Sequence, residues 1–229
     1  MKNKYVIETD GLSKIYPGVV PVKAVDQVDL KIENNEFTAI VGPSGSGKST
    51  LLNMIGGLDR PTSGTIKVND ILLNGMTDNQ LIDYRLHHIG FVFQSYNLIP
   101  VLTAKENAEF IMLLQKVPHA KREDRVMSLL KEVGLEDRVN SRPAQLSGGQ
   151  QQRVAVARAL ASKPDFVLAD EPTANLDSNS AFNLLDIMAR LNKEEGITFI
   201  FSTHDQRVID RARRVITLED GKILSDITK

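Results

Sequence analysis

Four short apolar runs divide the chain, and the segments between them have the hydrophobic spacing of helices. The runs are rich in β-branched or aromatic residues and do not alternate with polar ones, which predicts buried parallel strands. They are Thr38–Val41, Ile89–Phe93, Phe166–Ala169 and Ile197–Ser202. Between the last two, Ser178–Glu194 carries apolar residues on one helical face and is followed by Gly196, a residue that commonly ends helices. This strand–helix–strand order predicts an α/β domain with a mainly parallel sheet.

Two parts of the chain depart from that order: the N-terminal part, described first, and residues 95–145. Residues 1–35 and 62–75 contain short alternating runs such as Thr65–Val68, which predict an antiparallel β subdomain at the edge of the fold. Near the end of the chain, Asp220–Gly221 separates two apolar runs and predicts a hairpin turn.

The second departure is a stretch without a strand pattern, residues 95–145. Within it, Thr103–Lys116 and His119–Val133 have helical spacing, and Pro118 lies between them. We therefore expect a single domain in which 1–94 and 146–229 form the α/β core with its antiparallel subdomain. Residues 95–145 are expected to form an all-helical insertion.

A phosphate-loop pattern follows the first predicted strand. Gly42-Pro43-Ser44-Gly45-Ser46-Gly47-Lys48-Ser49 matches G-x-x-x-x-G-K-[ST], and a helical run begins at Thr50. Glycines allow backbone N–H groups to curl around a phosphate, and the helix N-terminus adds partial positive charge. Lys48 is expected to reach the β- and γ-phosphates, and the Ser49 hydroxyl to bind Mg²⁺. An accidental match in a Gly-rich turn is disfavoured by the strand–loop–helix setting.

A second glycine motif, Leu146-Ser147-Gly148-Gly149-Gln150, lies further along the chain. Ser147 is a good N-cap for a predicted helix over Gln151–Ala161. A capped helix does not explain two adjacent glycines, which lower helix stability. They indicate close backbone approach to an anion at the helix N-terminus. Because the phosphate loop already accounts for one nucleotide, a second anion site needs another explanation.

With these two motifs, the chain resembles the ATP-binding cassette (ABC) family over nearly its whole length. In that family, residues matching Leu146–Gln150 close over the γ-phosphate held by the phosphate loop of a second, head-to-tail subunit. The resemblance implies ATP as the nucleotide, Mg²⁺ as its cation, and a homodimer that encloses two ATP molecules. It also implies the ABC ATPase fold, with a phosphate-loop (RecA-like) core.

Polar residues follow four of the predicted strands. The phosphate loop follows Val41, Gln94 follows the next strand, Asp170-Glu171 follows Ala169, and His204 ends the run Ser202-Thr203-His204. A charged residue often ends a strand without any functional role. Ligands of open parallel sheets, however, bind at the carboxyl ends of the strands. Four such ends at one edge of a sheet predict an active site.

The resemblance implies a role for each of these residues. Asp170 would hold Mg²⁺ through water, and Glu171 would orient and deprotonate the attacking water. His204 matches a histidine that contacts the γ-phosphate, although a lone histidine is often structural. Gln94 matches a glutamine that contacts Mg²⁺ and leads into the helical insertion.

Two further positions are implied by the resemblance. Leu176-Asp177 matches a loop that crosses the dimer centre, where Ala174-Asn175 is a mild departure from the Ser-Ala or Gly-Asn found in many members. Tyr16 lies where the family has an aromatic residue that stacks on adenine. The alternative for Tyr16 is a core tyrosine of the edge subdomain, and Tyr5 is a weaker candidate for stacking.

Composition narrows the class of protein. The 229 residues include no Cys, which excludes disulfides and Cys-ligated metals, and no cluster of acidic or His residues suggests a metal beyond Mg²⁺. Lys and Arg number 28 against 29 Asp and Glu, so there is no overall positive field for nucleic acid. Arg207, Arg211, Arg213 and Arg214 suggest a basic helix, for which a solvated charged face is the favoured interpretation.

The chain has no secretory signal pattern and no apolar run approaching the roughly 20 residues of a membrane-spanning helix. We expect it to be cytoplasmic and to reach the inner (plasma) membrane through a partner. Two hypotheses remain: the ATP-hydrolysing subunit of a transporter with a separate permease, and a soluble ABC-type ATPase. The interval between Lys48 and Leu146 is too short for the long coiled coil of DNA-repair types, and translation-factor types carry two cassettes.

Local sequence narrows the first hypothesis. Gly90–Pro100 and Gln150–Ala155 resemble the lipoprotein-releasing and macrolide-exporter branch, which implies export, lipoprotein release or mechanotransmission. The Ser95–Leu102 stretch is rich in apolar residues in a loop-like context. It predicts either a docking surface for a cytoplasmic helix of a homodimeric permease or a loop packed on its own helices.

Overall fold

A six-stranded sheet forms the centre of the protein in this computed structural model, which describes residues 4–229. Its strand order is β10-β9-β3-β8-β7-β6. The strands are β3 (Phe37–Val41), β6 (Ile89–Val92), β7 (Phe166–Asp170), β8 (Thr198–Ser202), β9 (Arg214–Glu219) and β10 (Lys222–Thr228). The strands from β9 to β6 are parallel, and β10 forms the predicted hairpin with β9. The predicted α/β fold and its four parallel strands are confirmed.

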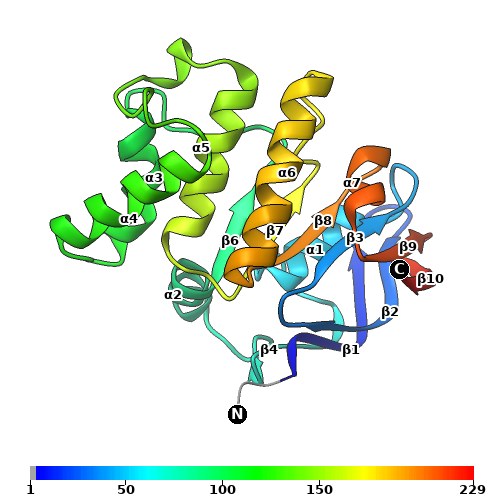
Figure 1. Ribbon diagram of the computed structural model, residues 1–229. Coiled ribbons are helices and arrows are strands. Elements are labelled where there is room, and N and C mark those ends of the chain that lie inside the picture. The colour runs from blue at the N-terminus through cyan, green and yellow to red at the C-terminus, as the bar shows by residue number, and fades with distance from the viewer. Residues whose placement is uncertain (1–3) are drawn as a thin grey trace.

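A second sheet of four antiparallel strands packs near one side of the first, in the order β2-β1-β4-β5 (Figure 1). Its strands are β1 (Tyr5–Tyr16), β2 (Val22–Glu33), β4 (Ser63–Val68) and β5 (Ile71–Leu72). The predicted antiparallel subdomain is thus confirmed for the described residues, and residues 1–3 of that prediction lie outside them.

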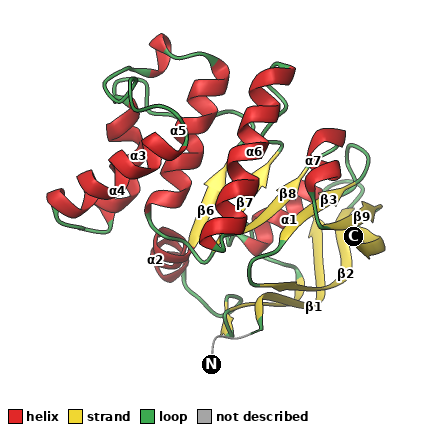
Figure 2. Cartoon of the chain, in the orientation of Figure 1, coloured by secondary structure: helices red, strands yellow, loops and turns green. Residues whose placement is uncertain are grey.

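Seven α-helices and one 3-10 helix complete the described chain (Figure 2). They are α1 (Lys48–Ile55), α2 (Asp78–His88), α3 (Ala104–Leu114), α4 (His119–Glu132), η1 (Pro143–Gln145), α5 (Gly148–Ala161), α6 (Ser178–Glu195) and α7 (Gln206–Arg211). Helix α2 was not predicted, because only Leu81 and Tyr84 of its residues are buried. Helix α5 begins three residues before its predicted start, since Ser147 caps it directly.

Two hydrophobic clusters hold these layers together. One joins α3, α4, α5 and α6 to one face of the six-stranded sheet and includes Phe37, Phe199 and Phe201. The other joins α1, the opposite face of that sheet and the antiparallel strands, and includes Phe166. Because each sheet face is covered, the carboxyl ends of the strands are the part of the sheet that is open to a ligand.

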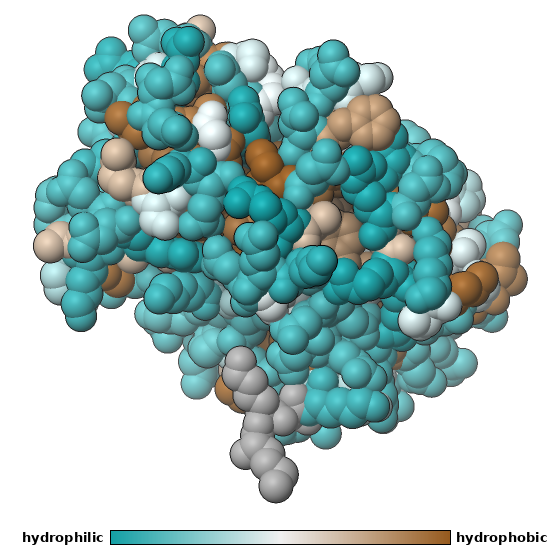
Figure 3. Space-filling model, viewed as in Figure 1, coloured by the Kyte–Doolittle hydropathy of each residue, from teal (hydrophilic) through white to brown (hydrophobic). Residues whose placement is uncertain are grey.

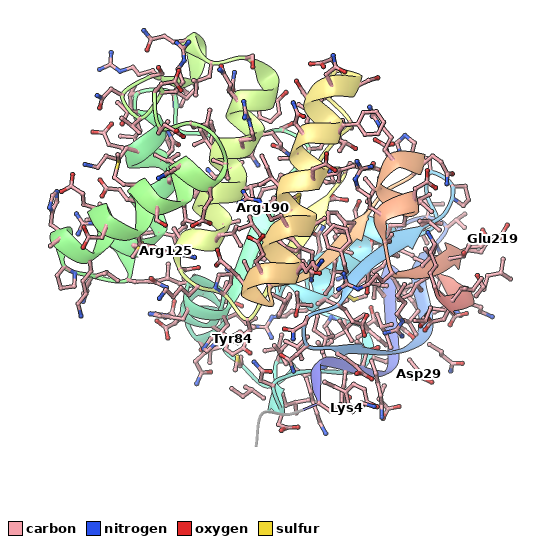
Figure 4. The ribbon with its side chains drawn as sticks, viewed as in Figure 1. Lys4, Asp29, Tyr84, Arg125, Arg190 and Glu219 are labelled. Carbon is pink, nitrogen blue, oxygen red and sulfur yellow. The ribbon has the colours of Figure 1, made fainter. Side chains whose placement is uncertain are left out.

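The α3–α4 region is also tied to the core by hydrogen bonds. Arg125 of α4 donates to Leu160 O at 3.2 Å, and Arg190 of α6 donates to Glu132 O at 2.6 Å. Figure 4 labels both arginines, which lie where α4 approaches α5 and α6. The helical region is therefore bonded to the core at its α4 end.

The predicted basic helix is wrong. Helix α7 ends at Arg211, and Arg214 begins β9. Arg207 pairs with Asp205, Arg211 with Asp186, and Arg214 with Glu36 and Asp226, all at 2.7–2.9 Å. Arg213 donates to Asn35 O and Asn192 Oδ1. These guanidinium groups are therefore engaged within the fold rather than presented as a positive surface.

Among residues 4–229, no helix has the length and apolar character to cross a bilayer. Figure 3 shows a face on which hydrophilic residues predominate, with apolar residues scattered between them.

Candidate active site

The phosphate loop connects β3 to α1, as the sequence predicts. Gly47 has φ 101°, and a Cβ atom there would lie 2.1 Å from Ala24 O, so no other residue fits without moving the backbone. Lys48 opens α1 and is 8% exposed. Its Nζ donates to Gly42 O and Pro43 O, each at 2.9 Å. The ammonium group of Lys48 therefore lies across the loop, within the ring of backbone groups.

A hydroxyl and a carboxylate meet beside this loop. Ser49 Oγ of α1 donates to Asp170 Oδ1 of β7 at 3.0 Å, although the two residues are 121 positions apart in the sequence. Both offer hard oxygen atoms, the ligands that Mg²⁺ prefers. Among the described residues, no group of three or more His, Asp or Glu side chains could hold a metal ion. A cation at this point would therefore also depend on hydroxyl, amide or phosphate oxygens.

Glu171 follows Asp170 in a left-handed conformation, with φ 46°. A residue with a Cβ reaches this region at a cost of about 1 kcal/mol. Its backbone N–H donates to Ser202 O at 2.8 Å, which fixes the turn. Its carboxylate then lies 2.7 Å from His204 Nδ1 and accepts a hydrogen bond from the Thr203 hydroxyl at 3.2 Å. The ends of β7 and β8 thus bring an acid and an imidazole together.

Most of the site groups line one cavity of about 490 Å³. Asp170 does not line it but accepts a hydrogen bond from Ser49, which does. Most of the phosphate loop lines it, together with Gln94, Glu171, Ala174 and His204. The structure therefore brings together the polar residues that follow β3, β6, β7 and β8. The volume of this cavity, the backbone N–H groups of its glycines and the ammonium group of Lys48 suit a polyphosphate chain.

The loop after β6 is hydrogen-bonded to the loop after β7. Asn175 Nδ2 donates to Gln94 O at 3.0 Å, and Tyr96 Oη donates to Asn175 O at 3.3 Å. The Ala174-Asn175 sequence, noted above as a mild departure, therefore has a structural use. Its amide anchors the backbone of Gln94 at the cavity.

The Leu146–Gln150 motif does not line this cavity. A Cβ atom on Gly148 would lie 2.6 Å from Tyr96 Oη, and one on Gly149 would lie 2.7 Å from Ser180 Oγ. Ser180 Cβ, 2.8 Å from that position, constrains Gly149 closely, whereas the contact at Gly148 is with the end of the Tyr96 side chain. These packing contacts were not visible in the sequence and are separate from approach to an anion.

The other implied site residues lie at the margin of the site. Tyr16 is 39% exposed, donates to Asp59 Oδ2 at 2.7 Å and does not line the cavity, so it is not a core tyrosine. Burial, and next its bond to Asp59, raise the pKa of its hydroxyl. Asp177 caps α6 by accepting from Ser180 N at 2.9 Å, and Leu176 packs against the helical cluster.

One charged residue near the site was missed as a functional candidate. Asp205 accepts hydrogen bonds from Thr173 Oγ1 at 2.6 Å and from Arg207. Burial acts to raise its pKa, but the bonds from Arg207 and Thr173 outweigh burial and hold the pKa at about 2. The Asp205-x-Arg207 spacing was the feature of the sequence that could have indicated this ion pair.

A phosphate loop on a parallel sheet, with an acid and an imidazole at neighbouring strand ends, defines the site of a phosphate-loop nucleotide hydrolase. A family model described as "ABC transporter" matches residues 25–174. The chain belongs to the ABC transporter family, and it is a nucleotide-binding subunit of such a transporter. ATP hydrolysis is the general activity of the family's ATPases.

Relatives match over nearly the whole chain. It is 47% identical over 221 residues to the lipoprotein-releasing system ATP-binding protein LolD 1 of Rhodopseudomonas palustris, covering 95% of this chain and 98% of that protein. It is 46% identical over 222 residues to the macrolide export ATP-binding/permease protein MacB of Hyphomonas neptunium, covering 96% of this chain and 34% of that longer protein.

A solved structure has the same fold. The dimeric, post-hydrolysis ATP-binding cassette MJ0796 bound to ADP and Pi matches with a TM-score of 0.89 and 42% identity, covering 97% of this chain and 98% of that chain.

Proposed function

We propose that this subunit hydrolyses ATP to ADP and phosphate between two head-to-tail copies of itself, and that it drives a separate membrane permease. The supporting observation is the pairing of Glu171 with His204 at 2.7 Å, beside a cavity lined by the phosphate loop. The solved dimer with ADP and Pi supports both the chemistry and the assembly.

The phosphate loop, Gly42 to Thr50, holds the ATP phosphates in this proposal. Lys48 exchanges its two carbonyl partners for the β- and γ-phosphates. Ser49, Asp170 and Gln94 supply oxygens for Mg²⁺, with Asp170 acting through water. When bound, this cation neutralises charge on the phosphates. Tyr16 lies beside the loop and stacks on adenine.

Glu171 orients and deprotonates the attacking water. Its carboxylate is held in place by the Thr203 hydroxyl and His204 Nδ1, so it needs little reorganisation before it acts. Because Nδ1 of His204 faces Glu171, the Nε2 atom is left to contact the γ-phosphate. The side chain of His204 is 75% exposed, which leaves that approach open.

The second copy completes each site. Residues Leu146–Gln150 of one copy cover the γ-phosphate held by the other, and Leu176-Asp177 cross the dimer centre. The Ser147–Gln150 capping box supports this role, because it fixes the start of α5, where the helix N-terminus favours an anion.

The permease docks in an apolar groove of about 640 Å³ between α2, α3 and α5. Ile99, Phe110 and Leu114 are among its lining residues. The buried side chain of Asn107 shapes the adjoining loop, since it accepts from Ile99 N and donates to three carbonyls. The docking surface in this proposal is therefore shared between residues 95–145, the proposed helical subdomain, and the α2 and α5 side chains that face it.

The expected occupant is a cytoplasmic helix of the permease with at least one carboxylate. Arg85 and Arg158 also line the groove, and their side chains donate to backbone carbonyls rather than to carboxylates. Burial lowers the pKa of both guanidinium groups, so an opposite charge would be favoured there.

The similarity to LolD and MacB proteins supports export, lipoprotein release or mechanotransmission as the process. In this proposal the subunit acts at the cytoplasmic face of the inner (plasma) membrane. The soluble ABC-type ATPase remains the alternative from sequence, and no relative described above favours it.

The decisive experiment replaces Glu171 with Gln, which keeps the shape of the side chain and removes the base. We expect ATP binding to persist, turnover to fall at least 100-fold, and ATP to trap a dimer on size-exclusion chromatography. Wild type without nucleotide is expected to be mostly monomeric. Turnover at the wild-type rate in Glu171→Gln would show that another residue is the base.

A further inference from the structure

A buried glutamine joins the two loops that carry the proposed catalytic residues. Gln152 lies in α5 and is 0% exposed. Its Nε2 donates to Phe93 O at 3.1 Å and to Pro172 O at 2.9 Å. Phe93 immediately precedes Gln94, and Pro172 immediately follows Glu171.

The orientation of the amide follows from its surroundings. Two carbonyl oxygens require a donor, so the Nε2 atom must face them, and the opposite orientation would place three oxygens together. Among the described residues, Gln152 Oε1 has no hydrogen-bond partner, although it is buried. A buried unpaired oxygen lowers stability, so stability alone gives a weak reason for an amide at this position.

Phe93 and Pro172 lie just beyond the ends of the neighbouring strands β6 and β7, whose pairing stops at Val92 and Ala169. Helix α5 also begins within the Leu146–Gln150 motif, at Gly148, four residues before Gln152. One side chain thus connects three segments: the start of α5, the Gln94 loop and the Glu171 turn. The left-handed backbone of Glu171 makes that turn a place where an added hydrogen bond can hold the geometry.

We propose that Gln152 is a positioning residue for hydrolysis: by bridging Phe93 O and Pro172 O, it holds Gln94 and Glu171 in register with each other and with the N-terminus of α5. This inference rests on the proposed function, because it takes Glu171 as the base. It acts on kcat and leaves nucleotide binding to the phosphate loop.

The test compares Gln152→Met with a matched control, Asn192→Leu. Asn192 is also buried, at 2% exposed, and its Nδ2 donates to three backbone carbonyls near the opposite ends of the strands. Both changes remove a buried amide and keep its approximate volume. Comparing them separates a loss of stability from a loss of catalytic geometry.

We expect Gln152→Met to lower kcat about tenfold or more while the KM for ATP changes less than about twofold, since the phosphate loop is intact. Asn192→Leu is expected to lower the melting temperature and keep kcat near that of wild type. An unchanged kcat in folded Gln152→Met, or an equal loss in both variants, would overturn the proposal.

A second variant, Gln152→Glu, gives a readout that depends on pH. Burial raises the pKa of a carboxyl group, and only its neutral form can donate to a carbonyl. The kcat of Gln152→Glu relative to wild type should therefore rise between about pH 8.5 and pH 6. A flat ratio, or failure of Gln152→Met to fold combined with a flat ratio, would assign Gln152 to stability alone. Glu171→Gln tests the base separately, so the two proposals can fail independently.

Discussion

Tyr96 Oη occupies the space that a Cβ atom on Gly148 would need, since the two atoms would be only 2.6 Å apart. The same hydroxyl donates to Asn175 O, whose residue in turn holds Gln94 O. The Leu146–Gln150 motif, the Gln94 loop and the loop after β7 therefore meet at one tyrosine. A substitution in any one of these three segments is therefore expected to alter the contacts of the other two.

We expect Gly148→Ala to displace the Tyr96 ring and to lower ATPase activity further than Tyr96→Phe, which removes only the bond to Asn175. Adding Tyr96→Phe removes the clashing oxygen, and the next atom of the ring would lie 3.5 Å from the new Cβ, an ordinary contact. Part of the activity should then return. Steady-state ATPase rates of both single variants and the double variant form the test. No recovery in the double variant would mean that the clash is not the cause.

Lys48→Ala should abolish tight ATP binding, because the loop loses the one cation that lies across it. A Kd measured by calorimetry gives the answer. Lys67→Ala on the exposed side of β4 is the control and should bind as wild type does. Unchanged affinity in Lys48→Ala would contradict the assignment of this loop.

The pKa of Asp205 makes stability depend on pH. Its folded value of about 2 lies below the ordinary value of 3.8, so its contribution is present above about pH 4 and is lost as the pH falls through 2. The shift corresponds to about 1 to 2 kcal/mol after allowance for partial exposure to solvent.

Urea unfolding of wild type and Asp205→Asn should thus differ by about that amount at neutral pH. The difference should shrink between pH 4 and pH 2. Asp205 also caps α7 by accepting a hydrogen bond from Arg207 N at 2.9 Å, and a difference that stays constant with pH would point to the loss of this cap rather than of the charge.

Docking can be tested within one loop. Ile99 lines the apolar groove, whereas Val101 is 72% exposed and does not. Ile99→Asp should abolish co-purification with the permease and keep basal ATPase activity, and Val101→Asp should keep both. Leu98 is unsuitable for this test because it packs against the helical core. Normal co-purification and normal stimulation with Ile99→Asp would refute the docking surface.

The sequence predicted the sheet well because buried parallel strands are continuous apolar runs, and Phe166–Asp170 could hardly be anything else. It failed at α2, whose stability comes from a capping box at Thr77 and two buried side chains rather than from an apolar face. It also failed at Arg213 and Arg214, since spacing alone cannot show that a charge has a partner elsewhere in the chain.

The candidate site was predicted as a set of residue types at strand ends, and that set lines one cavity apart from Asp170, which is bonded to Ser49 at its edge. What could not be predicted were contacts between loops. Gln152, Asn175 and Tyr96 donate hydrogen bonds to backbone carbonyls. Because every residue has a carbonyl, the residue type of the acceptor does not indicate such a bond. Such bridges become visible only when the loops are placed together.

Helix α5 has a mechanical consequence of its own. It starts within the Leu146–Gln150 motif and carries Arg158 about 16 Å further along its axis. Arg158 donates to the carbonyls of Tyr96 and Asn97 beside the docking groove. No break in the helix separates these two points. In the proposed assembly, a permease helix that displaced Arg158 would also displace the start of α5 at Ser147, and the membrane partner would act on the ATP of the opposite subunit without an intervening flexible joint.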